Sequence, residues 1–141
     1  IVAGQAWECE ARVALEQYHR AKTGSLFVAA AVAGAVAAGA QAQAWRVLGE
    51  SLGEAYQVAD DIRDVAADPE LLGKPIGQDD MHGRPSAVRE LGMPGAVAHF
   101  RELMDAAVEA IPPCPGAQQL AGLIRLEAQR LVPKEIVRHA A

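Results

Sequence analysis

Three carboxylates and one amide recur at helical spacing in the middle of the sequence. Gln57, Asp60, Asp61 and Asp64 stand at positions i, i+3, i+4 and i+7, which places them on one face of a helix. Acids near the C-terminal end of a helix repel one another and oppose the helix macrodipole, at a combined cost of roughly 1 kcal/mol or more. We therefore expect a cation there. Oxygen ligands without His or Cys favour Mg²⁺. Water molecules and substrate phosphates usually complete the coordination of this ion.

An acidic face that only water solvates is the alternative, because many charge runs on helices simply face solvent. The helix is predicted to span about residues 44–66. Its other face carries a core-facing apolar stripe, formed by Leu48, Leu52, Ala55, Ala59 and Ile62. One side of this helix should therefore pack, while the other side binds a cation or faces water.

The composition indicates one all-α domain. The chain has 141 residues, of which 51% are hydrophobic and only 4% aromatic, and alanine is abundant, as is typical of close helix packing. The net charge is −5, and no Lys/Arg tract with interleaved aromatic residues is present. Nucleic acid is therefore not an expected partner.

The cysteines and the first residues predict a cytoplasmic protein. Cys9 and Cys114 lie far apart and form no metal-ligand spacing, which is typical of thiols in a reducing compartment. The opening residues, 1–4, contain neither the basic region of a secretory signal nor a starting Met. We expect the sequence to begin inside a longer protein.

A second candidate site interrupts the helix predicted over residues 11–38. Gly24 costs up to about 1 kcal/mol relative to Ala within a helix, and Thr23 can bond the backbone instead. A kink there would direct Lys22 and Thr23 into a cavity, where an ammonium and a hydroxyl could bind an anion. The alternative is an exposed Lys beside a tolerated Gly. Residues 26–40 are apolar but too few to cross a membrane, and predict a tightly packed core helix.

The remaining segments suggest a loop and a scaffold. The stretch after Asp68-Pro69, up to about Ser86, is rich in Gly and Pro and carries Lys74 and Arg84, which predicts a functional loop that can cover a site with cations. Pro94 is expected to open the next helix, through Ile111, and a last helix should span about residues 116–132. We expect the helices at 11–38 and 44–66 to form the antiparallel centre of a bundle.

Three ordered motifs carry a family resemblance. They are Lys22-Thr23-Gly24, the stretch Gly53–Val65 that contains Asp60-Asp61-Ile62-Arg63-Asp64, and Leu72-Gly73-Lys74-Pro75. Together the motifs resemble the trans-isoprenyl diphosphate synthases, or polyprenyl synthetases, and most closely the bacterial geranylgeranyl diphosphate synthases. The resemblance implies an isoprenoid-synthase-type helical bundle, with residues 1–141 forming the C-terminal half of its single domain. The family's first aspartate-rich motif is absent from these residues.

The resemblance also implies roles for particular side chains. Lys22, Gln57 and Lys74 would bind the allylic diphosphate. Thr23 and Gln57 would stabilise the allylic cation through their oxygen atoms. Asp60 would bind Mg²⁺, and Asp61 and Asp64 would support the ion by direct ligation or through water.

The function expected from this resemblance is Mg²⁺-assisted condensation of isopentenyl diphosphate with an allylic diphosphate, in isoprenoid or carotenoid biosynthesis, by a full-length homodimer. The 141 residues alone are expected to be inactive. Two alternatives remain at this point. One is a catalytically incomplete subunit that binds diphosphate or regulates a partner, and the other is a helical interaction domain with a solvated acidic face.

Overall fold

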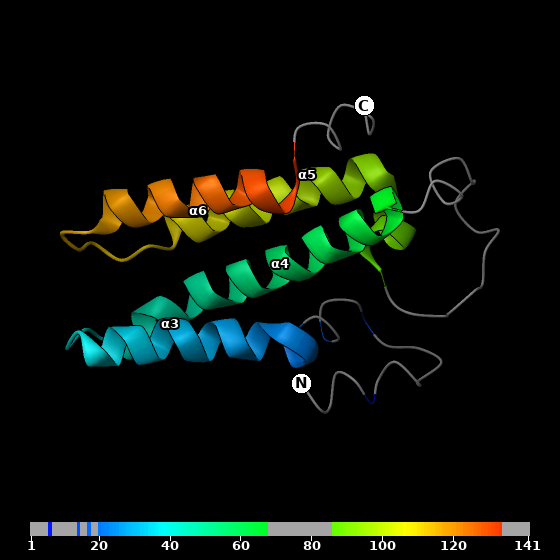
Figure 1. Ribbon diagram of the computed structural model, residues 1–141. Coiled ribbons are helices and arrows are strands. Elements are labelled where there is room, and N and C mark those ends of the chain that lie inside the picture. The colour runs from blue at the N-terminus through cyan, green and yellow to red at the C-terminus, as the bar shows by residue number, and fades with distance from the viewer. Residues whose placement is uncertain (1–5, 7–13, 15–16, 18–19, 68–85, 134–141) are drawn as a thin grey trace.

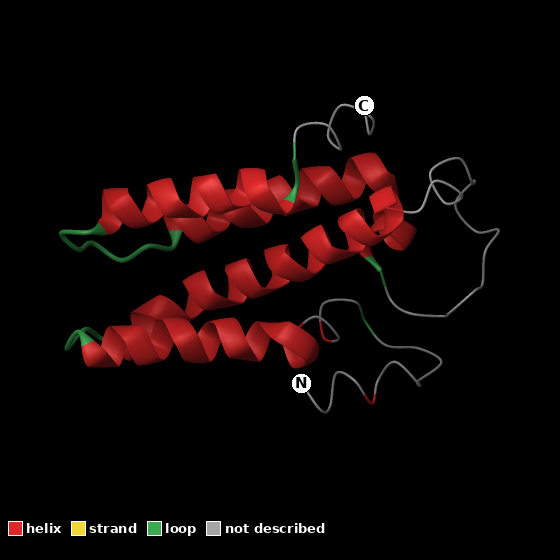
Figure 2. Cartoon of the chain, in the orientation of Figure 1, coloured by secondary structure: helices red, strands yellow, loops and turns green. Residues whose placement is uncertain are grey.

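The computed structural model describes residues 6, 14, 17, 20–67 and 86–133. The elements in chain order are a π-helical turn (Arg20–Gly24), α3 (Ser25–Ala37), a 3-10 turn (Ala42–Trp45), α4 (Arg46–Ala67), α5 (Ala87–Glu109) and α6 (Ala117–Leu131). The described part of the chain contains helices and no strand (Figure 2), which confirms the all-α prediction.

The four α-helices run up and down, each antiparallel to the next, and α4 is the central element (Figure 1). Helix α4 packs against α3 on one side and against α5 and α6 on the other. The core lies mainly between α4, α5 and α6, and includes Val58, Ala59, Ile62, Val97, Phe100, Met104 and Ile124. The stripe predicted on α4 is confirmed, because Ala55, Ala59 and Ile62 have no exposed surface.

Glycines allow α3 and α4 to lie very close together. A Cβ atom placed on Gly53 would stand 2.6 Å from the Cα of Gly24, and one placed on Gly49 would stand 2.6 Å from the Cα of Val28. Both distances are shorter than any normal contact between carbon atoms. The close antiparallel packing predicted for these two helices is therefore confirmed.

The prediction that residues 26–40 form a tightly packed core helix is wrong for the described residues. Ala35 is the only buried residue of α3, whereas the side chains of Leu26 and Val36 are 52% and 61% exposed. The apolar residues of α3 surround the whole helix, and its neighbours in the described chain, α4 and the turns before and after α3, cover only part of them. Within the described bundle α4 alone is central, and α3 lies at its edge.

The ends of the helices follow from local backbone geometry. Helix α3 ends at Ala37, and Gly39 follows with a φ of 71°. The Gly39 N–H donates to the Val36 carbonyl, and the Ala40 N–H donates to the Ala35 carbonyl. The predicted last helix is confirmed as α6. No described helix combines the length and the apolar character that crossing a bilayer requires.

Helix α5 begins seven residues earlier than the predicted start at Pro94. A kink at Gly92 (φ 72°, ψ 165°) divides α5, so Pro94 does stand in the first turn of its longer segment, as predicted. The short segment before the kink is not predictable from local sequence, because its stability comes from tertiary contacts. Ala87 has no exposed surface, and Val88 is 9% exposed.

Candidate functional site

The interruption predicted in the first helix is present as the π-helical turn Arg20–Gly24. Such turns widen a helix by one residue and are frequent at functional sites. Thr23 lies in this turn, and its Oγ1 donates a hydrogen bond of 3.1 Å to Oε1 of Gln57 on α4. Lys22 belongs to the same turn, but its side chain lies outside the described residues.

Gln57 is a buried polar side chain, only 4% exposed. A buried amide is costly unless it is hydrogen-bonded, so the Thr23 hydroxyl stabilises its position. Gly53, one turn earlier on α4, allows the close approach to Gly24 that places Thr23 within reach. The structure thus brings together two predicted site residues that are 34 positions apart in the sequence.

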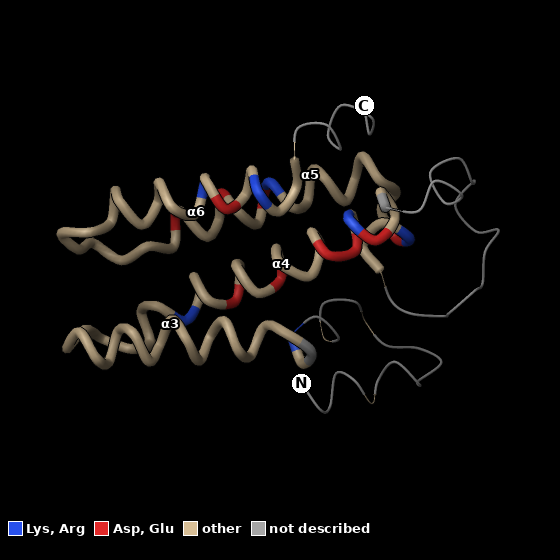
Figure 3. The backbone as a smooth tube through the Cα atoms, viewed as in Figure 1, with Lys and Arg blue, Asp and Glu red and all other residues tan. Residues whose placement is uncertain are grey.

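The acidic end of α4 lies beside the beginning of α5 (Figure 3). Asp60 has a side chain 46% exposed, and its Oδ1 accepts a hydrogen bond of 2.9 Å from Nη2 of Arg63. Nε of Arg63 also donates to the Ala59 carbonyl at 3.3 Å, and its guanidinium lies 5.9 Å from the centre of the Tyr56 ring. The cation expected beside Asp60 is therefore present within the chain itself as Arg63, which stands at the i+3 spacing of a helical ion pair.

Asp61 points toward a different partner. Its Oδ2 accepts a hydrogen bond of 2.7 Å from the backbone N–H of Ala87, the first residue of α5. Asp64, one turn after Asp60, is exposed. The single face predicted for the four polar residues is therefore divided between a buried amide, two carboxylates toward solvent and one carboxylate that contacts α5.

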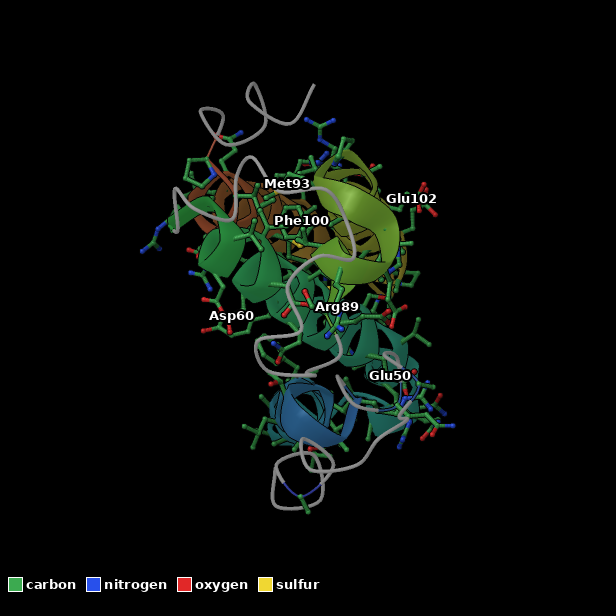
Figure 4. The ribbon with its side chains drawn as sticks, turned by 90° about the vertical axis from the view of Figure 1, so that its right-hand side faces the viewer. Glu50, Asp60, Arg89, Met93, Phe100 and Glu102 are labelled. Carbon is green, nitrogen blue, oxygen red and sulfur yellow. The ribbon has the colours of Figure 1, made fainter. Side chains whose placement is uncertain are left out.

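The donor chemistry at this end of α4 is that of carboxylate oxygens, which suits a hard divalent cation. The described residues contain no group of three or more His, Cys, Asp or Glu side chains gathered to hold a metal ion. Asp60 and Asp64 are four residues apart and extend from adjacent turns, so they can share one hydrated ion whose other ligands come from phosphate or water. Figure 4 shows Asp60 extending outward from α4, on the side away from the packed Phe100.

Lys74, which the resemblance assigns to diphosphate binding, and the loop around it lie outside the described residues. His99 on α5 is partly buried, and its Nε2 lies 3.3 Å from Oε1 of Glu54. This contact connects α5 to α4 three residues before Gln57.

An apolar cavity of about 360 Å³ opens between α4 and α6, next to the Thr23–Gln57 pair in sequence. Phe27 and Tyr56 contribute to its wall, with their ring centres 5.4 Å apart. The other lining residues are Leu52, Met104, Leu120, Leu123, Ile124, Glu127 and Leu131. The sequence gives no signal for this cavity, because its wall forms only where residues of α6 face residues of α3, α4 and α5.

The chain belongs to the polyprenyl synthetase family, whose model matches residues 1–113. The resemblance of the three motifs is thereby confirmed. The chain is 51% identical to the geranylgeranyl diphosphate synthase of Cereibacter sphaeroides over 136 residues, which cover 96% of this chain and 47% of that protein. It is 46% identical to the geranylgeranyl diphosphate synthase of Rhodobacter capsulatus over 132 residues, which cover 94% of this chain and 46% of that protein.

A more distant relative is the farnesyl diphosphate synthase of Escherichia coli, 42% identical over 102 residues that cover 70% of this chain and 34% of that protein. The chain spans about half the length of the two geranylgeranyl diphosphate synthases. No solved structure gives a significant match.

Proposed function

We propose that the protein to which this chain belongs is a short-chain prenyltransferase, which condenses isopentenyl diphosphate with an allylic diphosphate to form geranylgeranyl diphosphate. The observation that carries the proposal is the 3.1 Å hydrogen bond between Thr23 and Gln57, which joins two motif residues on different helices beside the acidic end of α4. The Cereibacter sphaeroides and Rhodobacter capsulatus relatives are both named geranylgeranyl diphosphate synthases, which supports geranylgeranyl diphosphate as the product.

The chemistry requires a diphosphate to leave while an allylic cation forms. When bound, Mg²⁺ supplies positive charge that stabilises the departing diphosphate. Asp60 would hold the ion, and Asp64 would do so directly or through water. The Asp61 carboxylate is turned toward α5, where its Oδ2 accepts the Ala87 N–H. Lys22 and Lys74 would bind the diphosphate oxygens as point charges.

The allylic cation requires dipoles without a nucleophile. The oxygen atoms of Thr23 and Gln57 offer such dipoles, and their mutual hydrogen bond holds them in place before any charge develops. The isoprenoid tail requires an apolar wall, and the cavity lined by Phe27, Tyr56 and α6 provides one. We also infer a Mg²⁺-dependent, cytoplasmic homodimer that serves isoprenoid and carotenoid biosynthesis.

Complementation with the N-terminal half of a relative tests this function. We expect the 141-residue chain alone to form no prenyl product, because the family's first aspartate-rich motif is not among its residues. We expect product when that half of the Cereibacter sphaeroides enzyme is supplied, either fused to the chain or as a separate polypeptide. This combination is called the complemented enzyme below. Product is measured by chromatography of the dephosphorylated C15 and C20 alcohols.

The other outcomes of the same assay decide between the alternatives. Product from the chain alone would contradict our account of which residues the reaction needs. Binding of inorganic pyrophosphate that depends on Mg²⁺, without product from a folded complemented enzyme, would favour a catalytically incomplete binding subunit. No Mg²⁺-dependent binding at all would favour the solvated acidic face.

Arg63→Gln is expected to strengthen metal binding. Arg63 occupies Oδ1 of Asp60 and places a positive charge where the cation would bind. An exposed ion pair of this kind contributes about 0.5–1 kcal/mol, so its removal should increase Mg²⁺ affinity about two- to fivefold. Isothermal titration with Mg²⁺ in the presence of inorganic pyrophosphate measures the change.

The matched control for Arg63→Gln is Arg130→Gln on α6. Arg130 forms an ion pair of the same i,i+3 spacing, with Glu127 at 2.6 Å, on α6 instead of α4. Arg130→Gln should leave Mg²⁺ affinity unchanged. Weaker binding in Arg63→Gln would show instead that Arg63 assists the metal or the diphosphate.

A further inference from the structure

The beginning of α5 lacks the usual cap. Ser86 has the extended backbone of an N-cap residue (φ −147°, ψ 135°), but its hydroxyl makes no capping hydrogen bond. The first N–H groups of a helix have no partner within the helix, and that of Ala87 belongs to a residue with no exposed surface. Asp61 supplies the missing acceptor from α4, 26 residues earlier, through Oδ2 at 2.7 Å.

The segment that Asp61 caps cannot be stable alone. The kink at Gly92 separates Ala87–Leu91 from the rest of α5, which leaves little more than one helical turn. A single turn fixes many dihedral angles for few hydrogen bonds, so it needs tertiary contacts. Burial of Ala87 and Val88 stabilises the turn through apolar packing, which is not directional. The hydrogen bond to Asp61 is directional and therefore fixes the residue at which the turn begins.

We propose that Asp61 is a positioning residue that anchors the first turn of α5 to α4, and that the metal-binding carboxylates of this helix are Asp60 and Asp64. The kinetic part of this inference rests on the proposed prenyltransferase function, but the structural part does not. The anchored turn carries Arg89, two residues after Ala87, whose N–H binds the neighbour of Asp60 on α4. Asp61 thereby holds an arginine-bearing turn next to the acidic end of α4.

Asparagine and alanine distinguish the two roles at position 61. Asp61→Asn keeps a side-chain oxygen that accepts the Ala87 N–H, and Asn is as good as Asp at helix caps, but the variant removes the charge that a metal ligand needs. Asp61→Ala removes both the acceptor and the charge. If Asp61 anchors α5, Asp61→Asn should keep the activity that Asp61→Ala loses. If Asp61 is a metal ligand, both variants should lose activity.

Amide hydrogen exchange of Ala87 in the 141-residue chain is the direct test. We expect the Ala87 N–H to be protected in the unmodified chain and in Asp61→Asn, and to exchange at least tenfold faster in Asp61→Ala. The unfolding midpoint of Asp61→Ala should fall by about 5 °C, because a buried donor is left without a partner. Fast exchange of this amide in the unmodified chain would overturn the proposal, and it would do so whatever the enzymatic activity is.

The Mg²⁺ dependence of the complemented enzyme is the second test. The Mg²⁺ concentration for half-maximal rate in Asp61→Asn should stay within about threefold of the parent, whereas Asp60→Asn should increase it more than tenfold. Asp105→Asn, on the exposed face of α5, is the control and should change neither the rate nor the exchange. An increase in Asp61→Asn as large as that in Asp60→Asn would overturn the positioning role and restore Asp61 as a ligand.

Discussion

Asp60→Ala should reduce the turnover of the complemented enzyme by about 100-fold or more, with normal folding. The Asp60 carboxylate is paired with the partly exposed side chain of Arg63, which another cation can replace. Charge develops in the transition state, and preorganised groups stabilise it. Removal of one such group typically lowers kcat by a factor of about 10²–10³. The rate constant and the Mg²⁺ dependence should change together, whereas the circular dichroism spectrum should not.

The control for Asp60→Ala is Asp105→Ala. Asp105 is also an exposed aspartate in a helix, but it lies on α5 near the opposite end of the bundle. Its removal should change the rate by less than twofold. Equal and small effects in both variants would mean that water alone solvates the acidic face of α4, and the proposed metal site would be wrong.

The sequence predicted the features that depend on short-range spacing. The helical spacing of Gln57 and the three aspartates, the apolar stripe opposite, and the interruption at Lys22-Thr23-Gly24 all follow from residue types within two or three turns. The close approach of α3 and α4 followed from their small residues. These predictions needed no knowledge of which helices are neighbours.

The features that depend on tertiary neighbours were not predictable in this way. The direction of Asp61 depends on where α5 begins, and that start depends in turn on Asp61 and on the burial of Ala87. Three aspartates on one helix face look equivalent in sequence, but one contacts α5, one pairs with Arg63, and one is exposed. The apolar residues of α3 could not reveal that α4 is the only other α-helix packed against α3 in the described part of the chain.

Gly53→Ala is expected to destabilise the protein by about 2 kcal/mol and to reduce turnover as well. The new methyl group would stand 2.6 Å from the Cα of Gly24. That atom belongs to the backbone, so no side-chain rotation relieves the clash and the helices must separate, at a cost of about 1–3 kcal/mol. Thermal or urea unfolding, followed by circular dichroism, measures the loss.

The loss of activity in Gly53→Ala should exceed the loss that destabilisation alone explains. Gly24 is adjacent to Thr23, and Gly53 lies one turn before Gln57, so the separation occurs where the 3.1 Å hydrogen bond between Thr23 and Gln57 must form. A hydrogen bond weakens steeply when its atoms move apart by a few tenths of an ångström. Turnover measured well below the unfolding midpoint should therefore fall, because the folded population itself is less active.

Gly122→Ala on α6 is the matched control, since a Cβ atom at that position meets nothing within 4 Å. There the substitution should stabilise the protein by about 0.5–1 kcal/mol, because Ala is the better helix former. The same chemical change thus has opposite expected signs at the two positions. Stabilisation by Gly53→Ala would show that α3 and α4 do not pack as closely as described, and the geometry that joins Thr23 to Gln57 would then have no basis.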